Sequence, residues 1–85
     1  MNQPRIGIVT HYFGRIRVAV VDLEHDLALG DHIQFVRRGF VQFDQEVTSM
    51  HIQHQSIQSA DAGQEIAIRV NEPVRKGTEI YFTAE

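Results

Sequence analysis

The chain has 85 residues, 42% of them hydrophobic and 22% charged, which is typical of one small globular domain spanning residues 1–85. It contains no cysteine, which excludes a disulfide framework and a thiolate metal site. The formal net charge of −3 argues against a dedicated nucleic-acid binder, because such proteins usually carry a basic excess.

The first residues and the apolar runs bear on localisation. Residues 1–13 lack the basic leader and the apolar core of roughly 7–15 residues that make up a secretory signal. The longest apolar runs, such as residues 18–21, are far shorter than the ~20 residues that span a bilayer. We therefore expect a soluble, cytoplasmic domain with no membrane partner.

Alternating apolar residues predict two strands near the N-terminus. In residues 5–13, Ile6 and Ile8 share one face at a spacing of two. The next strand, residues 15–22, is also predicted to be half-buried, with Ile16, Val18 and Val20 on the apolar face and Arg15, Arg17 and Ala19 on the other. Gly14 lies between the two runs, so the pattern predicts a hairpin with a tight connection.

The middle of the chain predicts a third strand and a longer, irregular one. Ile33 and Phe35 alternate with polar neighbours up to residues 37–39. In residues 40–53, Val47 and Met50 have opposite parity, which would move one of them out of the core unless the strand is interrupted. We expect a bulge or a sharp bend near residues 48–49.

The C-terminal part predicts two more strands, at residues 65–70 and 78–83, each preceded by a turn with glycine. Residues 54–62 form either a short helical turn or a loop, and no window has an apolar stripe at helical spacing. About six short strands predict an all-β fold, a small barrel or sandwich. Closure into a barrel is attractive because it removes exposed strand edges.

Signatures of catalysis and of cofactor binding are missing from the sequence. There is no phosphate-binding Gly-rich loop, so we expect no GTP binding by this chain alone, and no Gly-x-Ser-x-Gly elbow. Ser49 is near His51 and His54, but residues so close on one strand rarely form a catalytic triad. We expect no enzymatic activity and no cofactor.

Two groups of residues were weighed as metal sites. His51 and His54 are three residues apart, which places them on opposite faces of a strand, and no third ligand is evident. Residues 22–26 contain three carboxylates but lack the glycine and the spacing of a calcium loop. We interpret the first as solvated histidines and the second as an acidic turn, and expect no metal.

Basic residues are the candidate binding groups. Seven of the eight are arginine, which suits planar contacts to phosphate or carboxylate. The candidates for contact with RNA or a protein partner form three sites: Arg15 and Arg17, Arg37 and Arg38, Arg75 and Lys76. If the sites converge they can hold an RNA backbone, and if they are scattered they are ordinary surface charge.

Glycines mark the predicted turns. In the stretch D-L-A-L-G-D-H-I-Q-F, Gly30 can take the positive φ that a tight turn needs, and Asp31 can accept backbone N–H groups across it. Gly63 and Gly77 mark two further structural turns. We therefore interpret Asp31 as a turn residue and not as a catalytic carboxylate.

Four motifs occur in an order that resembles the β-barrel of translation factors. They are residues 27–31 with Ile33, similar to L-K-x-G-D-x-I; residues 45–50, similar to V-x-S-I/M; residues 60–68, similar to A-x-A-G-D-x-V-G-I; and residues 74–81, similar to V-x-x-G-D-x-V. Gln64 and Thr78 stand where the last two motifs have aspartate. Over residues 7–82 the chain thus resembles the second domain of elongation factor Tu, which implies a closed six-stranded antiparallel β-barrel of the translation-protein type.

Residues 12–21 and 48–52 look closest to stand-alone and accessory members of this family. One such member is the barrel at the C-terminus of collagenase-like peptidase-family proteins. The resemblance implies a non-catalytic binding module that contacts RNA, the ribosome or a tRNA-linked enzyme. The alternative is an accessory subunit that binds a separate catalytic chain and no nucleic acid.

Overall fold

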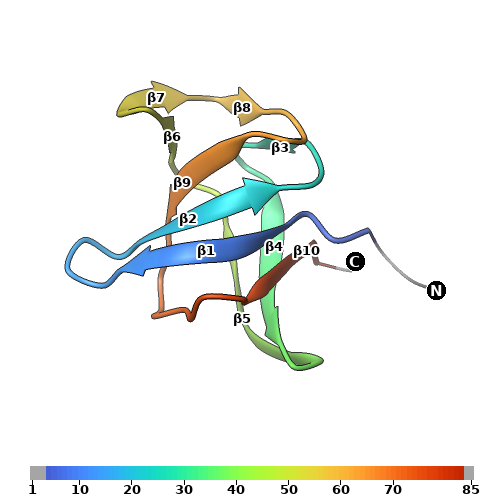
Figure 1. The fold of residues 1–85 in the computed structure, drawn as a ribbon. Helices are drawn as coiled ribbons and strands as arrows, with labels where there is room; N and C mark the ends of the chain where they lie inside the picture. Colours follow the sequence, from blue (N-terminus) through green and yellow to red (C-terminus); the bar gives the residue numbers. More distant parts are fainter. Residues whose placement is uncertain (1–3, 84–85) are drawn as a thin grey trace.

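The computed structural model describes residues 4–83, and this part of the chain consists of strands and turns without a helix (Figure 1). The ten strands are β1 (Gly7–Phe13), β2 (Val18–Leu23), β3 (Leu27–Ala28), β4 (His32–Arg37), β5 (Phe40–Glu46), β6 (Met50–Ile52), β7 (Gln55–Ile57), β8 (Ser59–Ala60), β9 (Glu65–Arg69) and β10 (Glu79–Phe82). The all-β prediction is therefore confirmed. Within residues 4–83 no helix is long and apolar enough to cross a membrane.

The strand pairing of the backbone does not form the predicted closed six-stranded barrel. Eight strands pair in one antiparallel sheet in the order β5-β4-β10-β1-β2-β9-β6-β7, and β3 and β8 pair separately. The sheet curves around the core, but its two ends, β5 and β7, are not joined by a ladder (Figure 1). At the free edge of β5, the side-chain amide of Gln45 bonds the backbone at Arg69 and Asn71 and so links β5 to the end of β9.

The hairpin of β1 and β2 differs from the predicted one. Residues 14–17 form a four-residue loop instead of a tight connection at Gly14, and Arg17 takes a positive φ of 55° there. The second strand therefore begins at Val18, not at Arg15. Ile16, expected in the core, lies in the loop with 61% of its surface exposed.

The face of β2 that packs in the core is also the opposite of the predicted one. Ala19, Val21 and Leu23 are buried, whereas Val18 and Val20 are only half-buried. Residues 18–21 are apolar at both parities, so alternation alone cannot choose the inner face. The structure places Val18 and Val20 on the outer face of the sheet.

The predicted interruption of the long middle strand is present. β5 ends at Glu46 and β6 begins at Met50, and both Val47 and Met50 are buried although their parities differ. Two further irregularities were not predicted, a register shift in β1 between Val9 and His11 and another between β4 and β5. Within residues 54–62, expected to be a short helical turn or a loop, the structure instead has the strands β7 and β8.

Three turns share the same glycine conformation and the same hydrogen bond. Gly30, Gly63 and Gly77 all have a φ of 92°, the value that the third position of a type II turn requires. The residue after each glycine accepts the N–H of the residue three before it: Asp31 Oδ2 from Ala28 at 2.9 Å, Gln64 Oε1 from Asp61 at 2.7 Å, and Thr78 Oγ1 from Arg75 at 3.3 Å. Gln64 and Thr78 thus supply the oxygen that aspartate supplies in the first turn.

Candidate functional site

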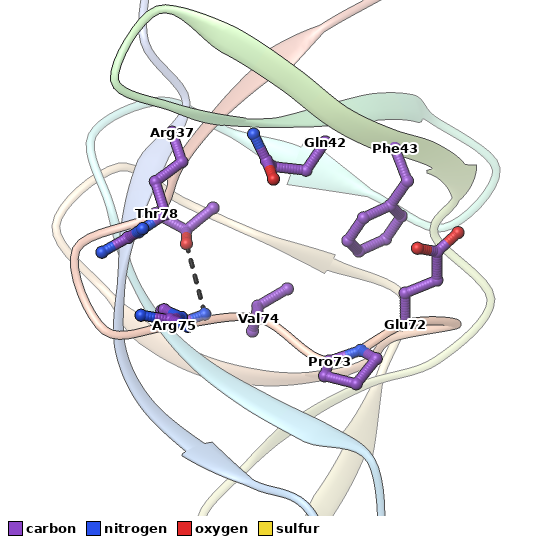
Figure 2. A pocket seen from close by; sticks show the side chains of 8 residues that line it. All are labelled: Arg37, Gln42, Phe43, Glu72, Pro73, Val74, Arg75 and Thr78. Carbon is purple, nitrogen blue, oxygen red and sulfur yellow. Dashed lines mark hydrogen bonds between the residues drawn. The ribbon is translucent and has the colours of Figure 1, made fainter.

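The structure has two candidate binding surfaces, and the first is a pocket that we call the arginine pocket. It measures about 290 Å³ and lies between the β4–β5 hairpin and the segment that leads into β10 (Figure 2). Its lining residues are Arg37, Gln42, Phe43, Glu72, Pro73, Val74, Arg75 and Thr78.

The two arginines of this pocket come from different segments that the fold brings together. Arg37 is the last residue of β4, where its backbone pairs with Phe40 of β5. Arg75 is fixed by the Gly77 turn, because its N–H donates to Thr78 Oγ1 at 3.3 Å and its carbonyl accepts the Thr78 N–H at 3.0 Å (Figure 2). Thr78 is 2% exposed, so the backbone at Arg75 is held from inside the protein.

The floor of the arginine pocket is apolar and its two ends carry opposite charge. Phe43 stacks on the buried Phe35 with ring centroids 4.5 Å apart, and Val74 is buried beside it. Figure 2 shows Arg37 and Arg75 toward one end of the pocket and Glu72 at the other. The geometry therefore suits a ligand with charged groups at both ends.

The other predicted basic residues do not line this pocket. Arg15 and Arg17 lie in the β1–β2 loop, and Figure 1 shows that loop at the opposite side of the molecule from the β4–β5 turn. Arg38 lies in the β4–β5 turn with a φ of 54°, and Lys76 in the turn before β10. Of the three predicted basic sites, two therefore contribute one arginine each to a shared pocket.

The second surface is an apolar groove of about 480 Å³ on the outside of the sheet, which we call the outer groove. It is lined by Phe13, Ile16, Val18, Val20, His51, Gln53, His54, Glu65, Ile66 and Ala67. Phe13 is 47% exposed and Ile16 61%. Sequence reasoning missed this surface, because it assigned the stripe of Ile16, Val18 and Val20 to the core.

Strand register builds the outer groove. Val18 on β2 pairs with Phe13 on β1, and Val20 on β2 pairs with Ala67 on β9. Ala67 in turn pairs with His51 on β6. Paired residues of antiparallel strands project to the same face, so apolar side chains from three strands form one surface with a histidine at its edge.

The two histidines considered as metal ligands both border this groove. His51 is on β6 and His54 is in the tight β6–β7 turn, where Gln53 and His54 have φ values of 49° and 68°. β6 ends at Ile52, so His54 is not on the strand and lines the same groove as His51. No group of three or more histidine, aspartate or glutamate side chains within residues 4–83 could hold a metal ion.

Two of the three acidic residues in 22–26, Glu24 and Asp26, have structural partners. Glu24 accepts two hydrogen bonds from Arg5, from Nε and Nη2, at 2.9 Å each, and Asp26 Oδ1 accepts the Ala62 N–H at 2.9 Å. The bonds between Arg5 and Glu24 raise the pKa of the guanidinium and lower the pKa of the carboxyl. The acidic turn thus holds the loop after β2 to its neighbours.

A second bond extends this network to β10. Arg5 Nη1 lies 3.5 Å from Glu79 Oε2, and Tyr81 donates its hydroxyl to Glu79 Oε1 at 2.8 Å. Donation to Glu79 raises the pKa of the Tyr81 phenol. None of these groups lines either candidate surface, so the network is structural.

Comparison with known proteins points to the peptidase side of the predicted resemblance. No protein-family model matches the chain. An uncharacterized protease of Methanocaldococcus jannaschii is 31% identical over 80 residues, which cover 94% of this chain. The chain spans only 20% of the length of that curated relative.

Two solved structures also resemble this chain. The C-terminal domain of a Geobacillus thermoleovorans protein assigned to the U32 peptidases superposes with a TM-score of 0.85 at 17% identity. The match covers 93% of this chain and 91% of that one. The selenomethionine variant of the same domain matches equally well and is covered over 99% of its length. The superposition shows that this chain shares the fold of that C-terminal domain, and the resemblance to elongation factors stays a prediction.

Proposed function

We propose that this chain is an accessory, non-catalytic domain of a peptidase-family protein and that its outer groove binds the catalytic part of that protein. The observation that carries the proposal is the contiguous apolar surface that β1, β2 and β9 present outside the core. The inner face of the same sheet packs the core, and Phe13, Ile16, Val18 and Val20 are not members of that buried cluster.

The chemistry of the outer groove suits a protein partner. Burial of apolar surface yields about 25 cal/mol per Å², so covering Phe13 and Ile16 is a source of binding free energy. Glu65, Gln53 and the histidines add polar groups to the same surface. An apolar centre with a polar rim is the usual anatomy of a protein interface.

The comparisons support the choice of a catalytic portion as the partner. The chain spans 20% of the length of the related protease, so most of that protein lies outside the matched segment. The matching structure is a C-terminal domain, taken separately from the rest of its protein. A catalytic portion is therefore the natural neighbour for the outer groove, whether in the same polypeptide or in another.

The serines near the histidines are not hydrogen-bonded to them. Ser49 and Ser56 are each two residues from a histidine, and Ser56 pairs with His51 across β6 and β7, yet no hydrogen bond within residues 4–83 joins either serine to His51 or His54. A nucleophile and its base need such contact. We therefore assign any peptidase chemistry to the partner.

Affinity capture from the native host tests the proposal. The tagged chain is incubated with nuclease-treated extract, and bound proteins are identified by mass spectrometry. We expect the parent to capture a peptidase-family chain. The Phe13→Asp and Ile16→Asp variants should fail to capture it, because burying a charge in the groove costs desolvation free energy.

The matched control for the capture is Phe40→Asp. Phe40 is 74% exposed on β5 and does not line the groove, so its replacement keeps binding. Failure to capture a peptidase-family chain contradicts the proposal, and so does equal capture by the groove variants and the parent.

RNA or ribosome binding is the second candidate, favoured by the meeting of Arg37 and Arg75 in one pocket. Titration with tRNA at low and moderate salt tests it, since phosphate contacts weaken steeply as salt rises. Salt-sensitive binding at micromolar protein that Arg37→Gln and Arg75→Gln abolish would support this candidate. No binding at low salt would remove it.

A further inference from the structure

The arginine pocket is lined by two cations that form no ion pair within residues 4–83. The ion pairs within residues 4–83 are those of Arg5 with Glu24 and Glu79, and of His32 with Asp44. Arg37 and Arg75 have no acidic partner within 4.0 Å in that part of the chain. Two like charges around one pocket repel each other, and an anion between them relieves the repulsion.

Guanidinium groups favour one geometry of anion. Their N–H donors form a planar fork that matches the two oxygens of a carboxylate or of a phosphate. The Gly77 turn fixes the backbone of Arg75, and the strand pairing with Phe40 fixes that of Arg37. The guanidinium groups of Arg37 and Arg75 are therefore attached to backbone segments that are held in place.

Glu72 distinguishes the two classes of anion. It lies at the end of the pocket away from the arginines, and its carboxylate has no ion-pair partner within residues 4–83 (Figure 2). A phosphodiester chain is negative along its whole length, so Glu72 repels it. A peptide with a free N-terminus instead carries a positive ammonium group some distance from its carboxylate.

The space between the charged ends suits a short peptide. Gln42 donates from Nε2 to the Phe40 carbonyl at 3.0 Å, and Figure 2 shows its side-chain oxygen pointing toward Val74, where it can accept a peptide N–H. Phe43, Pro73 and Val74 offer an apolar surface for one side chain. A volume of about 290 Å³ is at the low end for small-molecule sites, which limits the ligand to a short peptide.

We propose that the arginine pocket binds a short peptide in its zwitterionic form. The C-terminal carboxylate lies between Arg37 and Arg75, the N-terminal ammonium faces Glu72, and a side chain covers Phe43 and Val74. This site goes beyond the proposed accessory function and does not depend on it, because the pocket and the outer groove share no lining residue.

Titrations of the 85-residue chain followed by amide NMR test the proposal. The probes are the dipeptide alanyl-leucine, its C-terminal amide, its N-acetylated form and inorganic phosphate. We expect alanyl-leucine to shift the amides of Gln42, Val74, Arg75 and Thr78 saturably. Loss of either terminal charge weakens binding by roughly tenfold, the cost of one ionic contact of ordinary strength.

Neighbouring residues supply matched variants for the arginines. Arg37→Gln and Arg75→Gln remove cations that line the pocket, whereas Arg38→Gln and Lys76→Gln remove adjacent cations that do not line it. We expect the first pair to weaken alanyl-leucine binding by roughly tenfold and the second pair to leave it nearly unchanged. The rest of the amide spectrum shows whether each variant is folded.

Glu72→Gln tests the other end of the pocket. It weakens binding of free alanyl-leucine but not of the N-acetylated form, which has no ammonium group to lose. The proposal is overturned by no saturable shift with alanyl-leucine, by tighter binding of phosphate than of the dipeptide, or by equal losses in the lining and adjacent variants. Equal affinity for the free and acetylated dipeptides also overturns it.

Discussion

Asn71 donates its backbone N–H to Oε1 of Gln45 at 2.8 Å, which joins the segment after β9 to β5. The same side chain donates from Nε2 to the Arg69 carbonyl at 2.8 Å. One amide thus makes the pair of bonds that a neighbouring backbone would make at the place where the ladder is open. Gln45 is only 4% exposed, so water cannot easily replace it.

We expect Gln45→Leu to lower the free energy of unfolding by about 1–3 kcal/mol, because it leaves a donor and an acceptor without their partner. Gln45→Glu keeps the acceptor for Asn71 but places a partly desolvated negative charge against the Arg69 carbonyl. That variant should regain stability toward acidic pH, where the protonated carboxyl again has an O–H to donate. Denaturant unfolding at neutral and acidic pH measures both effects.

Gln42→Ala is the control for Gln45, because Gln42 is an exposed residue of the same strand that bonds only the nearby Phe40 carbonyl. Its stability should stay within about 0.5 kcal/mol of the parent. A Gln45→Leu variant as stable as the parent would show that the amide bridge does not hold β5 to the segment after β9.

Replacing Gly30 should lower the free energy of unfolding through its backbone conformation alone. A Cβ at Gly30 meets nothing within 4 Å, but its φ of 92° is one that L-residues rarely adopt. We expect Gly30→Val to lose roughly 1–2 kcal/mol and Gly30→Asn less, because asparagine tolerates positive φ. Thermal unfolding checks the order of the two variants.

Asp31→Asn is the companion change in the same turn. The asparagine keeps an oxygen that can accept the Ala28 N–H, now 2.9 Å from Asp31 Oδ2, so we expect little loss of stability. Asp31→Ala removes the acceptor and should cost about 0.5–1.5 kcal/mol. If Asn and Ala were equally destabilising, the charge and not the hydrogen bond would be the source of stability.

These turns also show how far sequence reasoning reached. Glycine with a following polar residue is a local pattern, and the same chemistry operates wherever it occurs, so the turns at Gly30, Gly63 and Gly77 could be read directly. The all-β class followed from the same local alternation of apolar residues. The open ends of the sheet could not be read, because they depend on which distant strands meet.

The outer groove could not be predicted from the sequence, for a different reason. Val18 and Val20 alternate as core residues do, and only the pairing of β2 with β1 and β9 shows which face is inside. The arginine pocket was half-predicted, since Arg37 and Arg75 were candidates but Glu72 was not. Its charge matters only because the fold places it across the pocket from them.

Gly7 should be sensitive for a steric reason, in contrast to Gly30. It pairs with both Leu23 and Ile80, and a Cβ there would lie 2.6 Å from the Asp22 carbonyl oxygen and 2.9 Å from Val21 Cγ1. Because the nearer atom is backbone, it cannot move aside without shifting β2. We expect Gly7→Ala to cost about 1–3 kcal/mol in chemical denaturation.

Gly14→Ala is the matched control for Gly7, because Gly14 is exposed in the β1–β2 loop and the nearest atom to its Cβ would be a ring carbon of Tyr12 at 3.4 Å. It should leave stability nearly unchanged. Equal losses in the two variants would mean that the contact between Gly7 and the Asp22 carbonyl is not the cause.

The ion pair of Arg5 and Glu24 predicts a pH-dependent part of the stability. Hydrogen bonds from Arg5 lower the pKa of Glu24 below its ordinary value of 4.5 in the folded state. The contribution is therefore present above that value and is lost as pH falls through the lower pKa of the folded protein. Both side chains are more than a third exposed, at 35% and 43%, so the effect is small and weakened by salt.

We expect Glu24→Gln to unfold at a lower temperature than the parent near neutral pH, with the difference shrinking as the solution is acidified below pH 4.5. Glu46→Gln is the control, because Glu46 is exposed on β5 and has no ion pair within residues 4–83. Thermal unfolding of the three proteins across this pH range makes the comparison. A Glu24→Gln difference that persists unchanged in acid would show that the carboxylate charge is not what stabilises the loop after β2.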